Sequence, residues 1–407
     1  MTLHRHLVDA VVLALREIFA NGRPAERTVG GHLRSHLKWG ARDRRFFAES
    51  VYEIVRHWRR LWHLAGLPAA DFCLSDRITT EAVWKVWLAW WIDVHGAAPS
   101  MEMPVSLIPS EVVQRGAAIS DLAVAGSLPA WIHRKCDAAY GERWPDLLEA
   151  LNNPADVFLR ANRLKITRDE LRKRLAKEEV ASEIVAEAPD GLRLVERRNL
   201  ATSPVIRDGL AEVQDAGSQM IAPLLGAQPG EFVIDACAGA GGKTLHLAAL
   251  MENQGRLLAL DVEQAKLGEL EERCQRGGAT IVETQLLTGK EAASKLPAGA
   301  DRVLLDVPCS GMGVLRRSPD TKWKLNPKEL TRLVALQADI LKKYAAMVKP
   351  GGTLVYATCS ILPEENEAQV AAFLETKAGA SWRLDKEYHL FPDRQNSDGF
   401  YAAILQR

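Results

Sequence analysis

Two cysteines in the second half of the chain stand where an α/β enzyme would carry a nucleophile. Cys309 follows the predicted strand 301–306, and Cys359 follows the predicted strand 353–358. Strands of a parallel sheet carry their ligand sites at their carboxyl ends, so both thiols are expected at the same edge. A lone cysteine is more often a packing residue than a nucleophile. Two cysteines at one edge, with Asp306 and a proline just before Cys309, instead indicate covalent catalysis by a thiolate.

A glycine-rich loop connects the predicted strand 232–235 to the predicted helix 243–251. It contains Gly239, Gly241 and Gly242. Glycines let the backbone turn sharply and approach a ligand closely, and the first turn of the following helix presents free N–H groups. The same loop is also compatible with a plain tight turn, so it does not identify a ligand alone.

The residues around these glycines discriminate between three ligands. A phosphate-binding loop needs a glycine five residues before Gly242, where Cys237 stands, and a dinucleotide loop needs a third glycine where Thr244 stands. S-adenosylmethionine carries no phosphate, but its ribose hydroxyls want an acid at the end of the second strand. Asp261 stands there, so S-adenosyl-L-methionine is the predicted cofactor.

Methylation of a pyrimidine would use both groups of residues. Carbon 5 of cytosine is too weak a nucleophile to take a methyl group directly, and a thiolate adding to carbon 6 makes it carbanion-like. A carboxyl group near ring nitrogen 3 would stabilise the developing charge, for which Asp306 is the candidate. The proton on carbon 5 must then leave, and Cys309 is the candidate that assists this step.

The rest of the chain supplies the elements that position these residues. From residue 226 onward, predicted strands and helices alternate, which is typical of a doubly wound, mostly parallel α/β sheet of Rossmann-like type. The strands are predicted at 232–235, 256–261, 301–306, 353–358 and 400–405, and the helices at 243–251, 263–276, 327–348 and 364–376. Residues 130–225 read as a small α+β linking subdomain, and residues 1–125 have the periodicity of an all-α domain. We therefore predict three domains, 1–125, 130–225 and 226–407.

Three sequence runs resemble the Nol/Nop/Sun family of RNA cytosine-5 methyltransferases. They are 235–244, the Asp-Val-Pro-Cys-Ser-Gly run at 306–311, and the Ala-Thr-Cys-Ser-Ile-Leu-Pro-Glu-Glu-Asn-Glu run at 357–367. The sequence is most similar to bacterial enzymes that act on small-subunit ribosomal RNA and carry an N-terminal domain like the antitermination factor NusB. The resemblance therefore implies an RNA (cytosine-5-)-methyltransferase with an N-terminal NusB-like domain.

The resemblance also implies roles for single residues. Cys359 would be the nucleophile, Cys309 would be needed for product release, and Asp306 would serve both the cofactor pocket and the base. Asp261 would hold the ribose of the cofactor. The methionine part of the cofactor would be held by Cys237, Ala238, Gly239, Ala240, Gly241, Gly242 and Lys243. Where the family often has an acid near the adenine, residues 284–289 have none, and Gln285 is the candidate substitute.

An RNA substrate requires a basic surface, because phosphate contacts dominate nucleic-acid affinity. Residues 23–60 carry ten basic residues against four acidic ones, although the whole chain is neutral. We predict that this segment, together with Arg316, Arg317, Lys322 and Lys324, forms part of an RNA-binding surface. A solvated helix face with no RNA role is the competing interpretation.

Several alternatives remain open at the level of the sequence. Within the resemblance, transfer RNA competes with small-subunit ribosomal RNA as substrate, and a non-catalytic RNA-binding assembly factor would keep the same fold. A DNA cytosine-5 methyltransferase would use the Pro-Cys cysteine and lack the Thr-Cys one, and an oxidoreductase would leave the paired cysteines unexplained. The absence of a C-x-x-C pair, of a secretory signal and of a long apolar run predicts a cytoplasmic monomer without a metal or a membrane segment.

Overall fold

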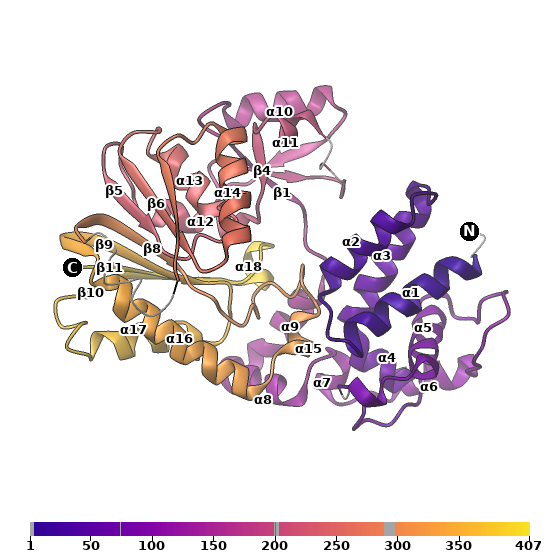
Figure 1. Ribbon diagram of the computed structural model, residues 1–407. Coiled ribbons are helices and arrows are strands. Elements are labelled where there is room, and N and C mark those ends of the chain that lie inside the picture. The colour runs from indigo at the N-terminus through magenta and orange to yellow at the C-terminus, as the bar shows by residue number, and fades with distance from the viewer. Residues whose placement is uncertain (1–3, 74, 199, 201–202, 289–297) are drawn as a thin grey trace. The chain divides into compact units, whose positions relative to one another are not determined.

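The computed structural model describes residues 4–73, 75–198, 200, 203–288 and 298–407, so Gly289 of the region near the adenine lies outside it. The chain forms two compact units (Figure 1). One unit joins residues 1–153 to residues 315–326, and the other joins 154–314 to 327–407. No helix within the described ranges is long and apolar enough to cross a membrane. The finer division into three domains stays a prediction.

The first unit is helical throughout its described residues. Its core packs around large apolar side chains such as Phe47, Trp58 and Trp87, all of which are fully buried. The helices are α1 (Arg5–Phe19), α2 (Ala25–Ser35), α3 (Ala41–Arg56), α4 (Trp58–Leu64), η1 (Ser75–Arg77), α5 (Thr80–His95), α6 (Pro109–Ala117), α7 (Leu122–Ala125), α8 (Ala130–Tyr140), η2 (Gly141–Arg143), α9 (Trp144–Asn152) and α15 (Thr321–Lys324). The N-terminal region is therefore all-α in its described residues.

Residues 315–326 interrupt the second unit in sequence and cap helices of the first unit. The Lys322 ammonium donates to the carbonyl oxygen of Arg56 at 2.8 Å, and the Trp323 indole donates to that of Val55 at 2.7 Å. These are the last carbonyls of α3, which have no partner within the helix. The Asp320 carboxylate accepts from the N–H of Ala25 at 3.1 Å, at the start of α2. A cation thus lies at a helix C-terminus and an anion at an N-terminus, as the helix dipole favours.

This arrangement corrects part of the predicted RNA-binding surface. Arg56, Arg316 and Lys322 are buried, with 4%, 5% and 0% of their surface exposed. Arg56 donates to the carbonyl oxygens of Leu315 and Arg316, so its charge is used inside the unit. A count of charged residues along the sequence assumes that every charged side chain faces solvent. That assumption fails where a basic side chain donates hydrogen bonds to buried backbone carbonyls.

Other basic residues of the 23–60 segment remain exposed. Arg60 and Arg45 are engaged in ion pairs with Asp93 and Glu49. The exposed basic side chains without a partner among the described residues are Arg27, Arg34, Lys38 and Arg42, on α2, α3 and the turn between them. The basic surface is therefore smaller than predicted and is centred on the turn between α2 and α3.

The second unit is built on a seven-stranded, mostly parallel sheet. The strand order is β10-β11-β9-β8-β5-β6-β7, in which β11 runs antiparallel to both of its neighbours and the other adjacent pairs are parallel. The strands are β5 (Phe232–Asp235), β6 (Arg256–Asp261), β7 (Val282–Leu286), β8 (Ala300–Asp306), β9 (Val348–Thr358), β10 (Arg383–Leu390) and β11 (Phe400–Gln406). The predicted Rossmann-like fold is confirmed. The order reverses between β5 and β8, which is where such sheets bind ligands.

Helices cover both faces of this sheet (Figure 1). Successive strand residues point to opposite faces, so Val233 and Leu257 join one core while Ile234 and Leu258 join the other. The first core contains residues of α12 (Ala216–Leu224), α13 (Gly242–Leu250) and α14 (Gln264–Gly277), and the second contains residues of α16 (Pro327–Ala345) and α17 (Glu367–Leu374). Apolar residues on both faces explain why these strands read as near-continuous hydrophobic runs. The short elements η4 (Pro363–Glu365) and α18 (Pro392–Gln395) complete this part.

The structure differs from the prediction at several elements: β9 begins at Val348 and not at residue 353, and neither β7 nor β10 was predicted. The helix predicted over 327–348 ends at Ala345, because Val348 pairs with Ala300 and already belongs to β9. The strand β10 was not predicted, since most of its side chains are exposed and polar and give no apolar alternation. Its backbone pairing with β11 alone makes it a strand.

A small antiparallel sheet, ordered β2-β3-β1-β4, also belongs to the second unit. Its elements are β1 (Phe158–Ala161), α10 (Arg168–Lys177), β2 (Ser182–Ile184), β3 (Gly191–Leu194), α11 (Pro204–Arg207) and β4 (Ala211–Val213). Thr167 and Glu170 form a capping box at the start of α10. This sheet presents the carboxyl end of β1 and the end of β4 to the glycine-rich loop.

Candidate active site

The glycine-rich loop lies at the end of β5 and touches the end of β6. Gly239 and Gly241 have φ values of +54° and +89°, which side chains with a Cβ rarely adopt. A Cβ on Gly241 would also lie 2.1 Å from a methyl carbon of Leu270. The N–H of Gly239 donates to the Asp261 carboxylate at 2.8 Å. The structure thus brings the loop and the acid of the second strand together.

Asp235 is a further acid beside the loop, to which the sequence reasoning gave no role. It is buried at the end of β5, where its carboxylate accepts from the Thr244 hydroxyl at 2.7 Å. Burial raises the pKa of Asp235 to about 6, against the opposing effect of the Thr244 hydrogen bond. Burial, followed by the charge of Asp235, likewise raises the pKa of the Cys237 thiol. Cys237 is therefore not set up as a nucleophile.

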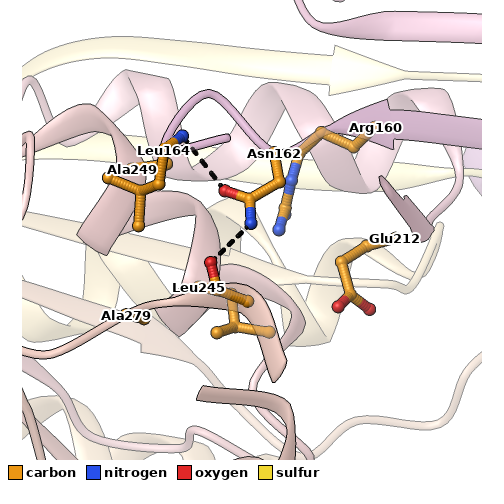
Figure 2. Close-up of a pocket in the computed structure, with 8 residues that line it drawn as sticks. Arg160, Asn162, Leu164, Glu212, Leu245, Ala249 and Ala279 are labelled. Atoms are coloured by element: carbon orange, nitrogen blue, oxygen red, sulfur yellow. Dashed lines mark hydrogen bonds between the residues drawn. The ribbon is translucent and has the colours of Figure 1, made fainter. Parts of the chain in front are cut away.

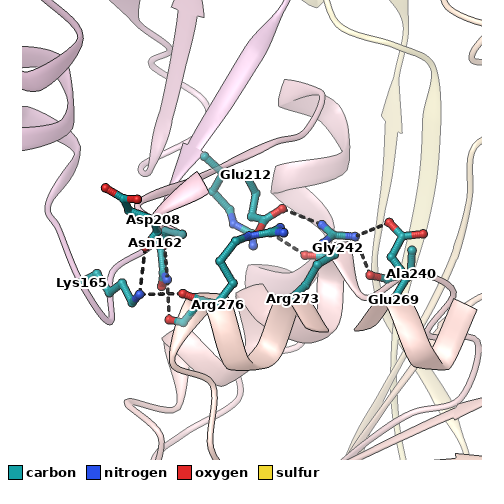
Figure 3. Close-up of polar contacts among 12 residues, drawn as sticks. Asn162, Lys165, Asp208, Glu212, Ala240, Gly242, Glu269, Arg273 and Arg276 are labelled. Atoms are coloured by element: carbon teal, nitrogen blue, oxygen red, sulfur yellow. Dashed lines mark hydrogen bonds and ion pairs between the residues drawn. The ribbon is translucent and has the colours of Figure 1, made fainter. Parts of the chain in front are cut away.

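Two arginines hold carbonyl groups of the glycine-rich loop, and Figure 3 shows one of them, Arg273, beside Ala240 and Glu212. Arg160 from β1 donates to the carbonyl oxygen of Gly242 at 2.6 Å, and Arg273 from α14 donates to that of Ala240 at 2.5 Å. Arg273 is also paired with Glu212 of β4 at 2.7 Å. Burial lowers the pKa of Arg160 to about 10. The sequence reasoning gave Arg160 no role, although a charged residue inside an apolar strand was a signal for one.

A small pocket lies where the small sheet meets α13 and α14 (Figure 2). Arg160, Asn162, Glu212 and Leu245 are among the residues that line it. The Asn162 amide donates to the carbonyl oxygens of Gly209 and Gly277, at 2.9 and 2.7 Å, and so joins the two sheets of the unit. Arg160 and Asn162 bind backbone carbonyls around this pocket and Glu212 pairs with Arg273 and Arg276, which marks it as a structural junction.

The two predicted nucleophile candidates meet at the carboxyl ends of adjacent strands. β8 and β9 are parallel, with Asp306 opposite Ala357, so the loops that follow them start side by side. The Sγ atoms of Cys309 and Cys359 lie 3.3 Å apart. The hydrogen bond with Cys359 and burial both raise the pKa of the Cys309 thiol. At neutral pH this site therefore keeps Cys309 as a thiol, which can exchange a proton.

Lys243 connects the glycine-rich loop to the cysteine loops. It lies in the first turn of α13, and its ammonium forms an ion pair with Asp306 at 2.6 Å. Burial acts to lower the pKa of Lys243, but the Asp306 carboxylate, and to a lesser extent Cys359, outweigh it and raise that pKa. Lys243 is therefore a permanent cation between Asp306 and the nucleophile candidates.

The remaining predicted residues surround this centre. Ala238 is buried beside the loop, and Gln285 is half-buried in β7, next to the end of β6. Among the described residues, no group of three histidine, cysteine, aspartate or glutamate side chains is arranged to hold a metal ion. Loop, acid, lysine and thiols thus gather at the carboxyl edge where the strand order reverses.

Comparison with known proteins assigns the chain to a family. The model described as "16S rRNA methyltransferase RsmB/F" matches residues 222–406, and the ferredoxin-like domain model of the same proteins matches residues 128–201. A curated relative from Synechocystis, named probable ribosomal RNA small subunit methyltransferase B, is 36% identical over 300 residues, which cover 69% of this chain and 67% of that protein. The chain belongs to the RsmB/F family. The predicted resemblance to Nol/Nop/Sun proteins is confirmed.

Other relatives of this RsmB/F family member agree with the assignment. Ribosomal RNA small subunit methyltransferase B of Vibrio vulnificus is 36% identical over 284 residues, 68% of this chain. The matched stretch covers 66% of that protein, slightly under two thirds of its length. A crystal structure of a methyltransferase homologue from Pyrococcus horikoshii has a TM-score of 0.61 and 29% identity, covering 70% of this chain and 98% of that one.

Proposed function

We propose that this protein transfers a methyl group from S-adenosyl-L-methionine to carbon 5 of a cytosine in small-subunit ribosomal RNA. The observation that carries the proposal is the pair of thiols 3.3 Å apart, beside the Lys243–Asp306 ion pair. Two thiols at one strand edge suit a reaction that needs both a nucleophile and a second group that assists product release. Ribosomal RNA is the substrate named for the curated relatives.

The residues around the glycine-rich loop fit S-adenosylmethionine. A Cβ on Gly239 would meet no atom within 4 Å, so the loop is open on that side, and Asp261 offers a carboxylate to a ribose diol. Asp235 and Asp306 supply negative charge for the cationic part of the cofactor, and the first turn of α13 supplies N–H groups for its carboxylate. When bound, this cofactor supplies an electrophilic methyl group.

The chain's own residues would divide the reaction into steps. The Cys359 thiolate adds to carbon 6 of cytosine, which places a negative charge on carbon 5 and the ring. Asp306 holds the polar edge of the base, and the Lys243 ammonium offsets the charge that develops there. After carbon 5 has gained the methyl group, its proton leaves to water and the electrons of that C–H bond re-form the double bond between carbons 5 and 6, which breaks the bond between Cys359 and carbon 6. The Cys309 thiol donates a hydrogen bond to the departing Cys359 sulfur. Product and free Cys359 are thereby released.

The RNA backbone would be held in part by the turn between α2 and α3. Arg34, Lys38 and Arg42 are exposed at or next to that turn, and Arg27 is exposed near the start of α2. Each phosphate that they neutralise releases a counterion. The NusB-like character of this helical region belongs to the same proposal. Arg316 and Lys322, which are buried, take no part in it.

The decisive experiment measures methyl transfer from labelled S-adenosylmethionine to unmodified small-subunit ribosomal RNA. We expect label at carbon 5 of cytosine with wild-type protein, none with Cys359→Ala, and a trapped protein–RNA adduct with Cys309→Ala. Cys73→Ala, which changes an exposed cysteine of the helical unit, is the matched control and should behave as wild type. Label on transfer RNA alone would overturn the substrate, and failure to bind the cofactor or label any RNA would leave a non-catalytic RNA-binding factor.

A further inference from the structure

Glu365 is a buried carboxylate that lies behind both cysteine loops. None of its surface is exposed. Its Oε1 accepts from the N–H of Ser310 at 2.7 Å and from the Gln337 amide at 3.0 Å. Its Oε2 accepts from the hydroxyl of Ser360 at 2.5 Å and from that of Ser310. A buried carboxylate is costly unless hydrogen bonds replace its water, and here four donors do so.

The donors are placed next to the two thiols in the sequence. Ser310 directly follows Cys309, and Ser360 directly follows Cys359. One carboxylate therefore ties the two loops together at the residues that adjoin the sulfur-bearing ones. The two serine hydroxyl oxygens also lie 3.1 Å apart, because both hydroxyls point to the same carboxylate oxygen.

Neighbours of Glu365 hold the residues on the other side of each cysteine. The Gln337 amide, which binds Glu365, also donates to the carbonyl oxygen of Pro308 at 3.0 Å. Asn366, directly after Glu365, accepts from the Thr358 hydroxyl at 2.5 Å and donates to the carbonyl oxygen of Ser360 at 3.0 Å. Each cysteine is thus held on both sides by one buried network. Fully satisfied buried networks of this kind rigidify the segments they join.

We propose that Glu365 is a positioning residue that holds the Cys309 and Cys359 thiols at the distance covalent catalysis requires. It acts through Ser310 and Ser360. The inference rests on the proposed function, because it is that reaction which needs both thiols at one base. Its negative charge has a second consequence: it joins the Cys359 hydrogen bond and burial in raising the pKa of the Cys309 thiol.

The test compares Glu365→Gln with Glu375→Gln, the same change at an exposed glutamate directly after α17. The amide keeps the size of the side chain, but its NH₂ group faces donors and its charge is gone. We expect the single-turnover rate to fall about 100-fold while the KM for S-adenosylmethionine changes less than about threefold. Alkylation of Cys309 by iodoacetamide, followed against pH by peptide mass spectrometry, should shift to lower pH. The control should match wild type in all three measurements.

Wild-type rates and an unshifted Cys309 alkylation profile in Glu365→Gln would overturn the inference. The alkylation profile needs neither RNA nor cofactor, so it still decides the role of Glu365 if wild-type protein methylates no RNA and the proposed function fails. If Glu365→Gln does not fold, as judged by circular dichroism, Ser310→Ala and Ser360→Ala each remove one hydroxyl and keep the carboxylate. We expect about a tenfold loss of rate from each, and no loss from either would contradict the proposal.

Discussion

The glycine-rich loop and the cysteine loops lie at the same edge of one sheet, but groups of opposite charge hold them. The guanidinium groups of Arg160 and Arg273 bind carbonyl oxygens of the glycine-rich loop. The carboxylate of Glu365 instead binds N–H and O–H groups of the cysteine loops. The arginines are 82 and 33 residues from the carbonyls they bind, while Glu365 is five residues from Ser360. The conformation of the glycine-rich loop therefore depends on how the small sheet and α14 pack against it. The position of Cys359 depends on the turn that follows it in the sequence.

This difference predicts that the two regions fail in different ways. Damage to the arginines should weaken cofactor binding and leave the chemical step near normal, because the thiols keep their own support. Damage to the groups beside the thiols should slow the chemical step at unchanged cofactor affinity. Four variants, taken from the largest expected effect to the smallest, test this division.

Lys243→Met removes the cation that joins the two regions. We expect the single-turnover rate to fall by about 100- to 1,000-fold, as for the loss of one electrostatic stabiliser in a transition state. Lys266→Met, which breaks an exposed ion pair with Glu263 on α14, is the control and should keep the wild-type rate. A loss of less than tenfold for Lys243→Met would mean that the ion pair with Asp306 serves only the fold.

Arg160→Met removes one of the two arginines that donate hydrogen bonds to the glycine-rich loop. The KM for S-adenosylmethionine should rise about tenfold with the rate constant within threefold, because the carbonyl of Gly242 loses its donor. Chemical denaturation should show a loss of about 1–3 kcal/mol for the buried acceptors left unpaired. Arg163→Met, three residues along and with half its side chain exposed, should change neither. A slower rate constant at unchanged KM would contradict the division between the two regions.

Asp235→Asn tests the buried acid beside the cofactor loop by its effect on stability. The pKa of Asp235 is raised from 3.8 to about 6, so the folded state holds this proton more tightly than the unfolded chain. Its contribution is fully present below about pH 3.8 and is lost as the pH rises through about 6. Relative to wild type, the variant should therefore gain up to about 3 kcal/mol between pH 4 and pH 7. If the difference in unfolding free energy between the variant and wild type stays constant from pH 4 to pH 7, the pKa of Asp235 is not raised.

Lys38→Glu combined with Arg42→Glu changes neither loop. We expect RNA affinity at low salt to fall by about 3- to 10-fold, with a smaller dependence on salt, and the rate at saturating RNA to stay unchanged. Lys377→Glu, at an exposed position of the second unit, is the control for general loss of positive charge. An equal effect from the control would show that the turn between α2 and α3 has no special role. A changed rate at saturating RNA would break the separation between binding and chemistry.

Local patterns were enough to predict the elements that carry the site. β5 and β6 have the predicted bounds, because short Val-, Ile- and Leu-rich runs between turn residues read directly as buried strands. The end of α16 was not predictable in this way, since Met347 and Val348 continue its apolar pattern. Pairing with β8 assigns Val348 to β9, and that pairing involves residues far away in the chain.

The sequence by itself determined which chemical groups follow which strands, and hence that a glycine-rich loop, an acid and two cysteines would share one sheet edge. That inference needs only strand periodicity and the rule that parallel strands end together. Only the tertiary structure decided which charges serve the fold and which face solvent. Arg56 and Lys322, 266 residues apart, read as a binding surface but lie buried where they bind backbone carbonyls. The groups that a charged side chain contacts decide whether it stabilises the fold or faces solvent. Groups this far apart in the sequence come into contact only in the folded chain.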